Sequence, residues 1–109
     1  MQDLMIELNE HRETLTKAIK ILKQRGKEKA ESERNYRVEL QKEILRQRDA
    51  GTPVTIISDI CRGKEEIADL KMKRDIAESL YESAMQKIYQ TKLEIDIIQR
   101  QIEFERKGE

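Results

Sequence analysis

The chain contains few of the side chains that usually carry catalysis or bind metal ions. It has one cysteine, Cys61, and one histidine, His11. A metal site needs several such ligands close together, and an internal disulfide needs a second cysteine. The 22 Asp and Glu residues are spread along the chain, and no pair stands out as an acid and its base. Gly51 and Gly63 do not belong to a phosphate-binding loop. The sequence therefore predicts a protein that is not an enzyme, binds no cofactor and uses Cys61 for packing.

The composition is typical of long helices. Charged residues make up 40% of the 109 residues, aromatic residues make up 4%, and the formal net charge is zero. Such a composition is common in coiled coils. We expect a single all-α domain over residues 1–109, with helices over about 3–50 and 64–106. These would form an antiparallel two-helix coiled-coil hairpin.

The connector over residues 51–63 contains signals for a short helix. Gly51 is expected to end the first long helix in the left-handed conformation. Thr52 is expected to cap the short helix, which would run over about 53–62 and end at Gly63. The alternative is a β-strand over 54–57, where the residues are β-branched. The helix is favoured because such a strand would have no partner.

Apolar residues in both long segments recur at steps of three and four, which is the spacing of a coiled-coil seam. The row of the first segment contains the polar residues His11 and Glu33 besides Leu4, Leu8, Leu15, Ala18, Leu22, Gly26, Ala30, Tyr36, Leu40 and Ile44. The row of the second segment contains the polar residues Arg74 and Thr91 besides Ile67, Leu70, Ala77, Tyr81, Ala84, Ile88, Ile95, Ile98 and Ile102. The predicted register places Leu40 near Arg74 and Leu15 near Gln99. Arg74 is then expected to pair with Glu39 and Glu43.

A second apolar row lies beside this seam. It contains Ile19, Ile21, Val38 and Leu45 in the first helix, and Ile76, Leu80, Leu93 and Ile97 in the second. In a single hairpin this row would be exposed, and exposed apolar rows usually mark an interface. We therefore expect a homo-oligomer, or larger helical bundle, in which Leu80 and Ile97 contribute to self-association.

The first long segment also carries an excess of basic residues. The candidate basic face consists of Lys17, Lys20, Lys23, Lys27 and Arg34. One interpretation is that this face follows the phosphates of a nucleic acid. The balanced total charge and the scarcity of aromatic residues favour another, in which the charges pair along the coiled coil. A third is a small cyclic nucleotide held where subunits meet. The side chains that fit this third interpretation are Tyr36, Arg37, Arg74 and Tyr81.

The connector is unusually apolar for such a hydrophilic chain. Its aliphatic residues are Val54, Ile56, Ile57 and Ile60. One interpretation is that Val54, Ile57, Ile60 and Cys61 share one helix face, which covers the end of the hairpin at Leu45 and Ile67. The other is that Ile56, Arg62 and Lys64 point outward and form a partner-binding tip, since loops often carry binding.

Features of membrane and secreted proteins are not expected. The sequence has no run of 18 apolar residues, the length that suggests a membrane-spanning helix. The start at Met1 is acidic and lacks the basic and apolar blocks of a signal peptide. We therefore expect a cytosolic protein with no membrane partner.

Three stretches carry a resemblance: Pro53-Val-Thr-Ile-Ile-Ser-Asp-Ile-Cys-Arg-Gly-Lys, Glu66-Ile-Ala-Asp-Leu-Lys and Arg74-Asp-Ile-Ala-Glu-Ser-Leu-Tyr-Glu-Ser-Ala-Met. With them the chain resembles a type of small all-helical protein encoded in phages and prophages of Gram-positive bacteria. The resemblance extends over roughly residues 30–105. It implies an accessory role in the cytoplasm of the bacterial host and transfers no catalytic or ligand residues. By analogy with other short phage proteins, the partner would be a host protein, such as a component of a defence system. A role beside DNA in phage recombination or replication is the alternative.

Overall fold

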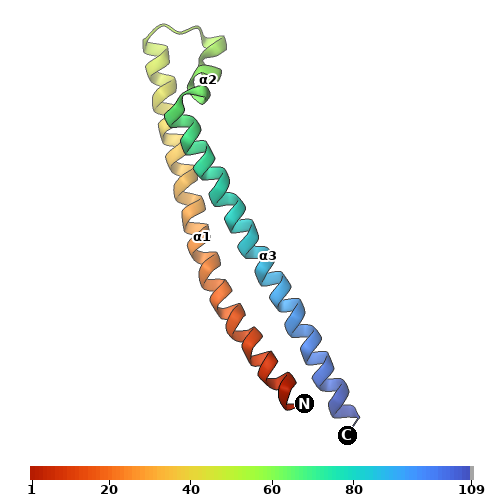
Figure 1. The fold of residues 1–109 in the computed structure, drawn as a ribbon. Helices are drawn as coiled ribbons and strands as arrows, with labels where there is room; N and C mark the ends of the chain where they lie inside the picture. The colour runs from red at the N-terminus through yellow and green to blue at the C-terminus, as the bar shows by residue number, and fades with distance from the viewer. Residues whose placement is uncertain (109) are drawn as a thin grey trace. The chain divides into compact units, whose positions relative to one another are not determined.

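The computed structural model describes residues 1–108, and its secondary structure is all-helical. The helices are α1 (Gln2–Asp49), α2 (Val54–Gly63) and α3 (Glu65–Lys107), as Figure 1 shows. Each helix begins and ends within one residue of its expected position. The described residues contain no strand, so the helical interpretation of the connector is confirmed and the β-strand over 54–57 is wrong.

Local sequence explains why the long helices start and stop where they do. The first turn of α3 contains Glu65 and Glu66, and its last turn contains Arg106 and Lys107. Acidic residues near the start of a helix and basic residues near its end complement the helix dipole. The termini of α1 follow the same rule, with Asp3 in the first turn and basic residues in the last.

Gly51 ends α1 in the expected left-handed conformation, with a φ of 81°. Its N–H donates to the carbonyl of Arg48 at 3.0 Å, and the N–H of Thr52 donates to the carbonyl of Gln47 at 3.0 Å. These two bonds are those of a Schellman motif, which satisfies the last carbonyl groups of a helix. Any residue with a Cβ would be strained at this φ.

The ends of α2 differ from the prediction. Pro53 occupies the N-cap position, and no side chain caps the helix. The Thr52 hydroxyl instead donates to Gln47 Oε1 at 2.7 Å, so it contacts the end of α1. Gly63 is the last residue of α2 and has no positive φ. The chain leaves the helix at Lys64, which has an extended conformation. The expected capping roles of Thr52 and Gly63 are therefore wrong.

The described residues divide into two compact units. The terminal unit comprises Met1–Gln24 and the described part of Tyr81–Glu109, and the central unit comprises Arg25–Leu80. Each unit contains a segment of α1 and a segment of α3, and α2 belongs to the central unit.

In the terminal unit, the segments of α1 and α3 run antiparallel. The amino group of Met1 lies 3.2 Å from Glu105 Oε2, and His11 Nε2 lies 3.1 Å from Glu94 Oε2. Between these pairs, one buried cluster contains Leu8, Ile98 and Ile102, with Leu4 and Ile95 packed against it.

The register is one heptad away from the predicted one. The prediction placed Leu15 near Gln99, whereas Leu8 packs in the same cluster as Ile98. In the central unit, Arg74 lies beside Glu33 rather than beside Leu40. In both units the partner on α1 therefore comes about seven residues earlier than expected.

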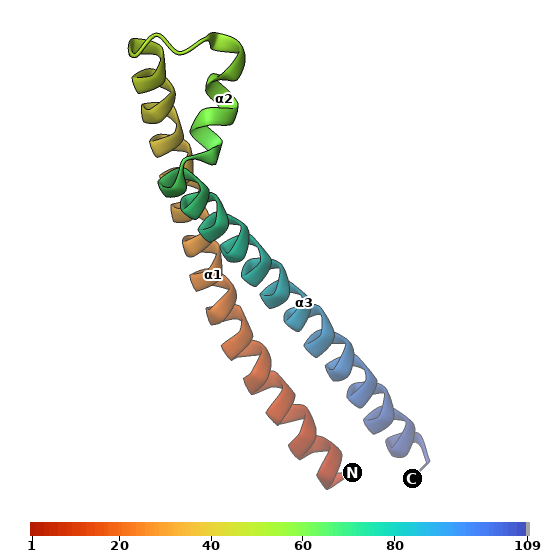
Figure 2. The ribbon, with the colours of Figure 1, turned by 45° about the horizontal axis from the view of Figure 1, so that its top comes forward.

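The position of α2 explains this shift. Figures 1 and 2 show α2 turning back alongside the last turns of α1 within the central unit. Because of this turn, α3 starts beside Glu43 instead of beside Ala50, and Lys64 Nζ lies 3.0 Å from Glu43 Oε2. A sequence that repeats every seven residues keeps its apolar seam after such a shift.

The predicted seam of α3 is confirmed by the burial of its residues. Each of its positions from Ile67 to Ile102 is buried or half-buried, including the polar residue Thr91, whose hydroxyl donates to the carbonyl of Lys87 at 2.7 Å. The seam of α1 is correct near Leu8 and Ala18 but wrong at Ala30, which is exposed.

Candidate functional site

Helix α2 buries one face and exposes the other. Ile57 and Cys61, one helical turn apart, are buried. Val54 and Ile60 were expected on the same face, but they are 75% and 41% exposed, so this expectation is wrong for both. Ile56 is exposed as predicted, at 44%. The helix therefore covers the central unit with two residues and leaves an apolar surface, which we call the α2 surface. Its residues are Val54, Ile56 and Ile60.

The two basic residues of the predicted tip have different surroundings. Lys64 makes the ion pair with Glu43, which ties it to the packing of the central unit. Arg62 is exposed and makes no ion pair or hydrogen bond with another described residue. Of these two basic residues, Arg62 is therefore the one whose charge can interact with an external ligand.

Glu43 is a buried acidic residue that was expected to pair with Arg74. Its side chain accepts hydrogen bonds from Gln47 at 3.1 Å, Lys64 at 3.0 Å and Arg46 at 2.9 Å. These bonds, in the order Gln47, Lys64 and Arg46, lower the pKa of Glu43 from 4.5 to about 2. The carboxylate is thus charged and fully partnered, as a buried acid needs to be. Glu43 follows Tyr36 by seven residues, and this heptad spacing was the signal that could have placed Glu43 in the seam.

Cys61 is shielded from solvent. Burial raises the pKa of its thiol, and the negative charge of Glu43 adds to this increase. A buried thiol with a raised pKa is a poor nucleophile. This agrees with the expectation that Cys61 packs rather than reacts.

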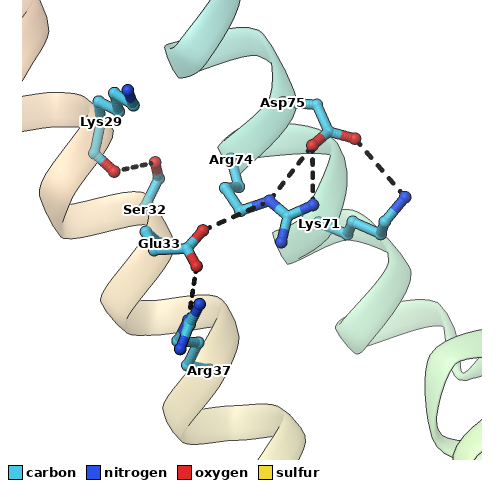
Figure 3. A network of polar contacts seen from close by, with 7 residues as sticks. All are labelled: Lys29, Ser32, Glu33, Arg37, Lys71, Arg74 and Asp75. Atoms are coloured by element: carbon cyan, nitrogen blue, oxygen red, sulfur yellow. Dashed lines mark hydrogen bonds and ion pairs between the residues drawn. The ribbon is translucent and has the colours of Figure 1, made fainter.

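Arg74 forms the centre of a polar network in the central unit (Figure 3). Its guanidinium lies 3.5 Å from Glu33 Oε2 and donates to Asp75 Oδ1 at 3.1 Å and 3.2 Å. Glu33 also accepts from Arg37 at 2.6 Å. The hydrogen bond to Asp75 raises the pKa of Arg74. The predicted pairing of Arg74 with Glu39 and Glu43 is wrong, because of the shifted register.

The Arg74 guanidinium also lies over the ring of Tyr36, 4.7 Å from its centroid. This cation–π contact holds the arginine against a buried ring. Two of the residues that fitted a nucleotide, Tyr36 and Arg74, are thus in contact. Tyr81 belongs to the terminal unit.

An open depression of about 500 Å³ lies on the surface of the central unit. We call it the basic depression. It is lined by Glu33, Tyr36, Arg37, Leu40, Gln41, Ile44, Arg62, Lys71 and Arg74. Four of these side chains are cationic and one is acidic, so positive charge dominates the lining.

The candidate basic face is exposed in both units. In the terminal unit, Lys17, Lys20 and Lys23 are exposed and form no ion pair with another described residue. In the central unit, Lys27 lies 3.9 Å from Glu31, and Arg34 donates to Asn35 at 3.3 Å. Lys27 is therefore the member of this face that lies near a carboxylate, whereas Arg34 contacts only a neutral amide and keeps its charge, as the three lysines of the terminal unit do.

The candidate self-association residues are both exposed in their own units. Leu80 is 39% exposed in the central unit and Ile97 is 55% exposed in the terminal unit. Ile97 lines a depression of about 430 Å³ together with Leu4, Arg100, Gln101, Phe104 and Glu105.

Among residues 1–108, no group of three or more His, Cys, Asp or Glu side chains is arranged to hold a metal ion. None of the described helices is long and apolar enough to cross a membrane. Comparisons with protein-family models, curated proteins and solved structures gave no match.

Proposed function

We propose that this chain is a non-enzymatic interaction protein that folds as an antiparallel coiled-coil hairpin, self-associates and presents α2 to a protein partner. The observation that carries the proposal is an exposed apolar row in each unit. The rows are Met72, Ile76 and Leu80 in the central unit, and Tyr89, Leu93 and Ile97 in the terminal unit. Residues four apart lie on one face of a helix, so each row forms a continuous apolar strip on α3.

The depression that contains Ile97 favours a second copy of the chain as the occupant. Its apolar residues Ile97 and Phe104 lie beside Arg100 and Glu105, which carry opposite charges. In a twofold-symmetric contact, the same surface meets itself, so Ile97 and Phe104 of one copy can pack against those of the other. Apolar area at the centre with compatible charges at the edge is the usual composition of an interface.

The double variant Leu80→Gln and Ile97→Gln tests self-association. Both changes replace exposed apolar side chains, so the helical content should stay unchanged while the assembly weakens. Light scattering should give a multiple of the 12.9 kDa chain mass for the wild type and a smaller mass for the variant. The matched control is Ser83→Gln and Lys92→Gln, two exposed polar positions on α3. A wild-type monomer at about 100 μM, which corresponds to a Kd weaker than that concentration, would contradict the proposal.

The proposal of a protein partner rests on the α2 surface. Exposed aliphatic side chains at Val54, Ile56 and Ile60 cost free energy in water unless a partner covers them. The resemblance to phage proteins suggests a bacterial host protein as that partner. In a pull-down from a Gram-positive lysate, Ile56→Glu should abolish capture of a protein that the wild type captures stoichiometrically. Ser58→Glu, an exposed change on the same helix, should retain it. Equal capture by both variants would exclude the α2 surface.

Nucleic-acid binding is a second candidate, favoured by the unpaired lysines of the terminal unit. If Lys17, Lys20 and Lys23 contact phosphates, affinity for DNA should fall steeply as salt increases. A gel-shift titration at two salt concentrations, with the triple Lys→Gln variant as a control, separates this function from protein binding. An absence of binding at low salt would exclude it.

A further inference from the structure

The basic depression brings together cations from all three helices. Arg37 lies on α1, Arg62 on α2, and Lys71 and Arg74 on α3. Glu33 is the acidic residue of the lining. A local excess of positive charge therefore exists in a chain whose formal net charge is zero.

Internal ion pairs neutralise part of this charge. Glu33 pairs with both Arg37 and Arg74, and Asp75 pairs with Arg74 and with Lys71, whose Nζ lies 3.7 Å from its Oδ2. The two carboxylates of Glu33 and Asp75 therefore neutralise only part of the charge of the four cations that line the depression. The arrangement leaves positive charge for an external anion.

The rest of the lining suits a flat group next to that anion. Tyr36, Leu40 and Ile44 are four residues apart, so they lie on one face of α1. The Arg74 guanidinium stacks on Tyr36 and still keeps 25% of its side chain exposed. Guanidinium planes and aromatic side chains are surfaces on which nucleobases stack. The volume of about 500 Å³ is within the range of roughly 300–1,000 Å³ found for small-molecule sites.

We propose that the basic depression binds a small phosphate ester that carries a flat ring, namely a nucleotide. Arg62 and Lys71 contact the phosphate oxygens, and Arg37 adds a planar donor group that matches phosphate geometry. Arg74, held by Tyr36 and Asp75, faces the ring of the ligand, which also contacts Leu40 and Ile44. This site goes beyond the proposed interaction function and does not depend on it.

Calorimetric titration of the full chain, at low salt and again at moderate salt, tests the site with four probes: ATP, a cyclic dinucleotide, pyrophosphate and a short oligonucleotide. We expect saturable binding of at least one nucleotide, tighter than binding of pyrophosphate. Arg62→Gln and Lys71→Gln should each weaken that binding roughly tenfold, the effect of losing a hydrogen bond to a charged group. Lys73→Gln should leave it unchanged, because Lys73 is an exposed cation of the same unit that does not line the depression. Arg62 and Lys71 are exposed, so circular dichroism should show that the variants keep the fold.

Four results would overturn the proposal. The first is an absence of binding of either nucleotide at millimolar concentration. The second is equal affinity for pyrophosphate, which would show that the ring is not recognised. The third is binding that Arg62→Gln and Lys71→Gln leave intact. The fourth is binding of an oligonucleotide alone, with a steep dependence on salt, which would assign the cations to a nucleic-acid surface.

Discussion

The carboxylate of Glu43 makes the stability of the central unit depend on pH. Its pKa is about 2 in the folded chain, against 4.5 ordinarily. The folded state therefore binds this proton less readily than the unfolded state does. Glu43 contributes its full stabilisation above pH 4.5, and the contribution falls as the pH decreases towards 2.

We predict that Glu43→Gln destabilises the chain at pH 7, because Lys64 and Arg46 lose their acidic partner. The difference in melting temperature between variant and wild type should decrease between pH 4.5 and pH 2, the window set by the two pKa values. Thermal melts monitored by circular dichroism across this range would measure it. Glu39→Gln, at a half-buried position of α1, is the control. A constant difference at all pH values would show that Glu43 acts through packing alone.

At the residue scale, the sequence predicted burial better than it predicted partners. The residues of the α3 seam were correct because steps of three and four fix one face of a helix. The partners of Arg74 were wrong because the register was not fixed by the seam. Glu43 was assigned to the wrong pair for the same reason. A charged residue fits an apolar pattern poorly, so its burial depends on partners that only the fold brings together.

At the element scale, Gly51 and Gly63 allow a controlled comparison of two glycines that differ in backbone conformation. Gly51 has a φ of 81°, whereas Gly63 has no positive φ, and a Cβ at either position would meet no atom within 4 Å. Gly51→Ala should therefore destabilise the chain by about 1 kcal/mol through backbone strain alone. Gly63→Ala should stabilise it by roughly 0.5 kcal/mol, because alanine loses less entropy in a helix.

Urea unfolding measures both values. The two variants add the same methyl group, so their opposite signs would isolate the backbone conformation as the cause. If both variants were equally destabilised, the left-handed end of α1 would not be the reason.

Cys61 reports on the docking of α2. Its side chain is 0% exposed, and burial raises the pKa of its thiol. We predict that a thiol reagent at pH 8 modifies the folded chain on the order of a hundredfold more slowly than the urea-unfolded chain, since reaction requires local opening. Ile57→Ala, which removes the buried neighbour, should accelerate the reaction. Ile56→Ala, on the exposed side, should not. Rapid modification of the folded wild type would show that α2 does not stay docked.

The helices themselves could be predicted almost completely from the sequence. Balanced charge, strong helix formers and the isolated Gly51 and Pro53 define their limits. The direction in which α2 turns could not be predicted, because its apolar residues are distributed around the helix. Ile57 and Cys61 become buried while Val54 and Ile60 stay exposed. That choice determines where α3 starts along α1, and hence the register.

At the scale of the whole molecule, the proposed hairpin and its proposed assembly depend on the same distribution of apolar residues. Each unit buries one seam and leaves an apolar strip on α3 exposed. One apolar seam on each helix is a small core, and small chains bury a smaller fraction of their surface than large ones do. Association that covers the strips would therefore contribute a large part of the stability.

This coupling leads to a prediction about concentration. If the folded chain self-associates, mass action stabilises it, and the melting temperature should rise with protein concentration. A hundredfold dilution from about 100 μM should lower the melting temperature of the wild type by several degrees. The Leu80→Gln and Ile97→Gln variant should melt at a lower temperature that changes little with dilution, because its association is already weakened. The Ser83→Gln and Lys92→Gln control should behave as the wild type does. A wild-type melting temperature that is independent of concentration would mean that the strips on α3 are covered by a different partner or remain in water.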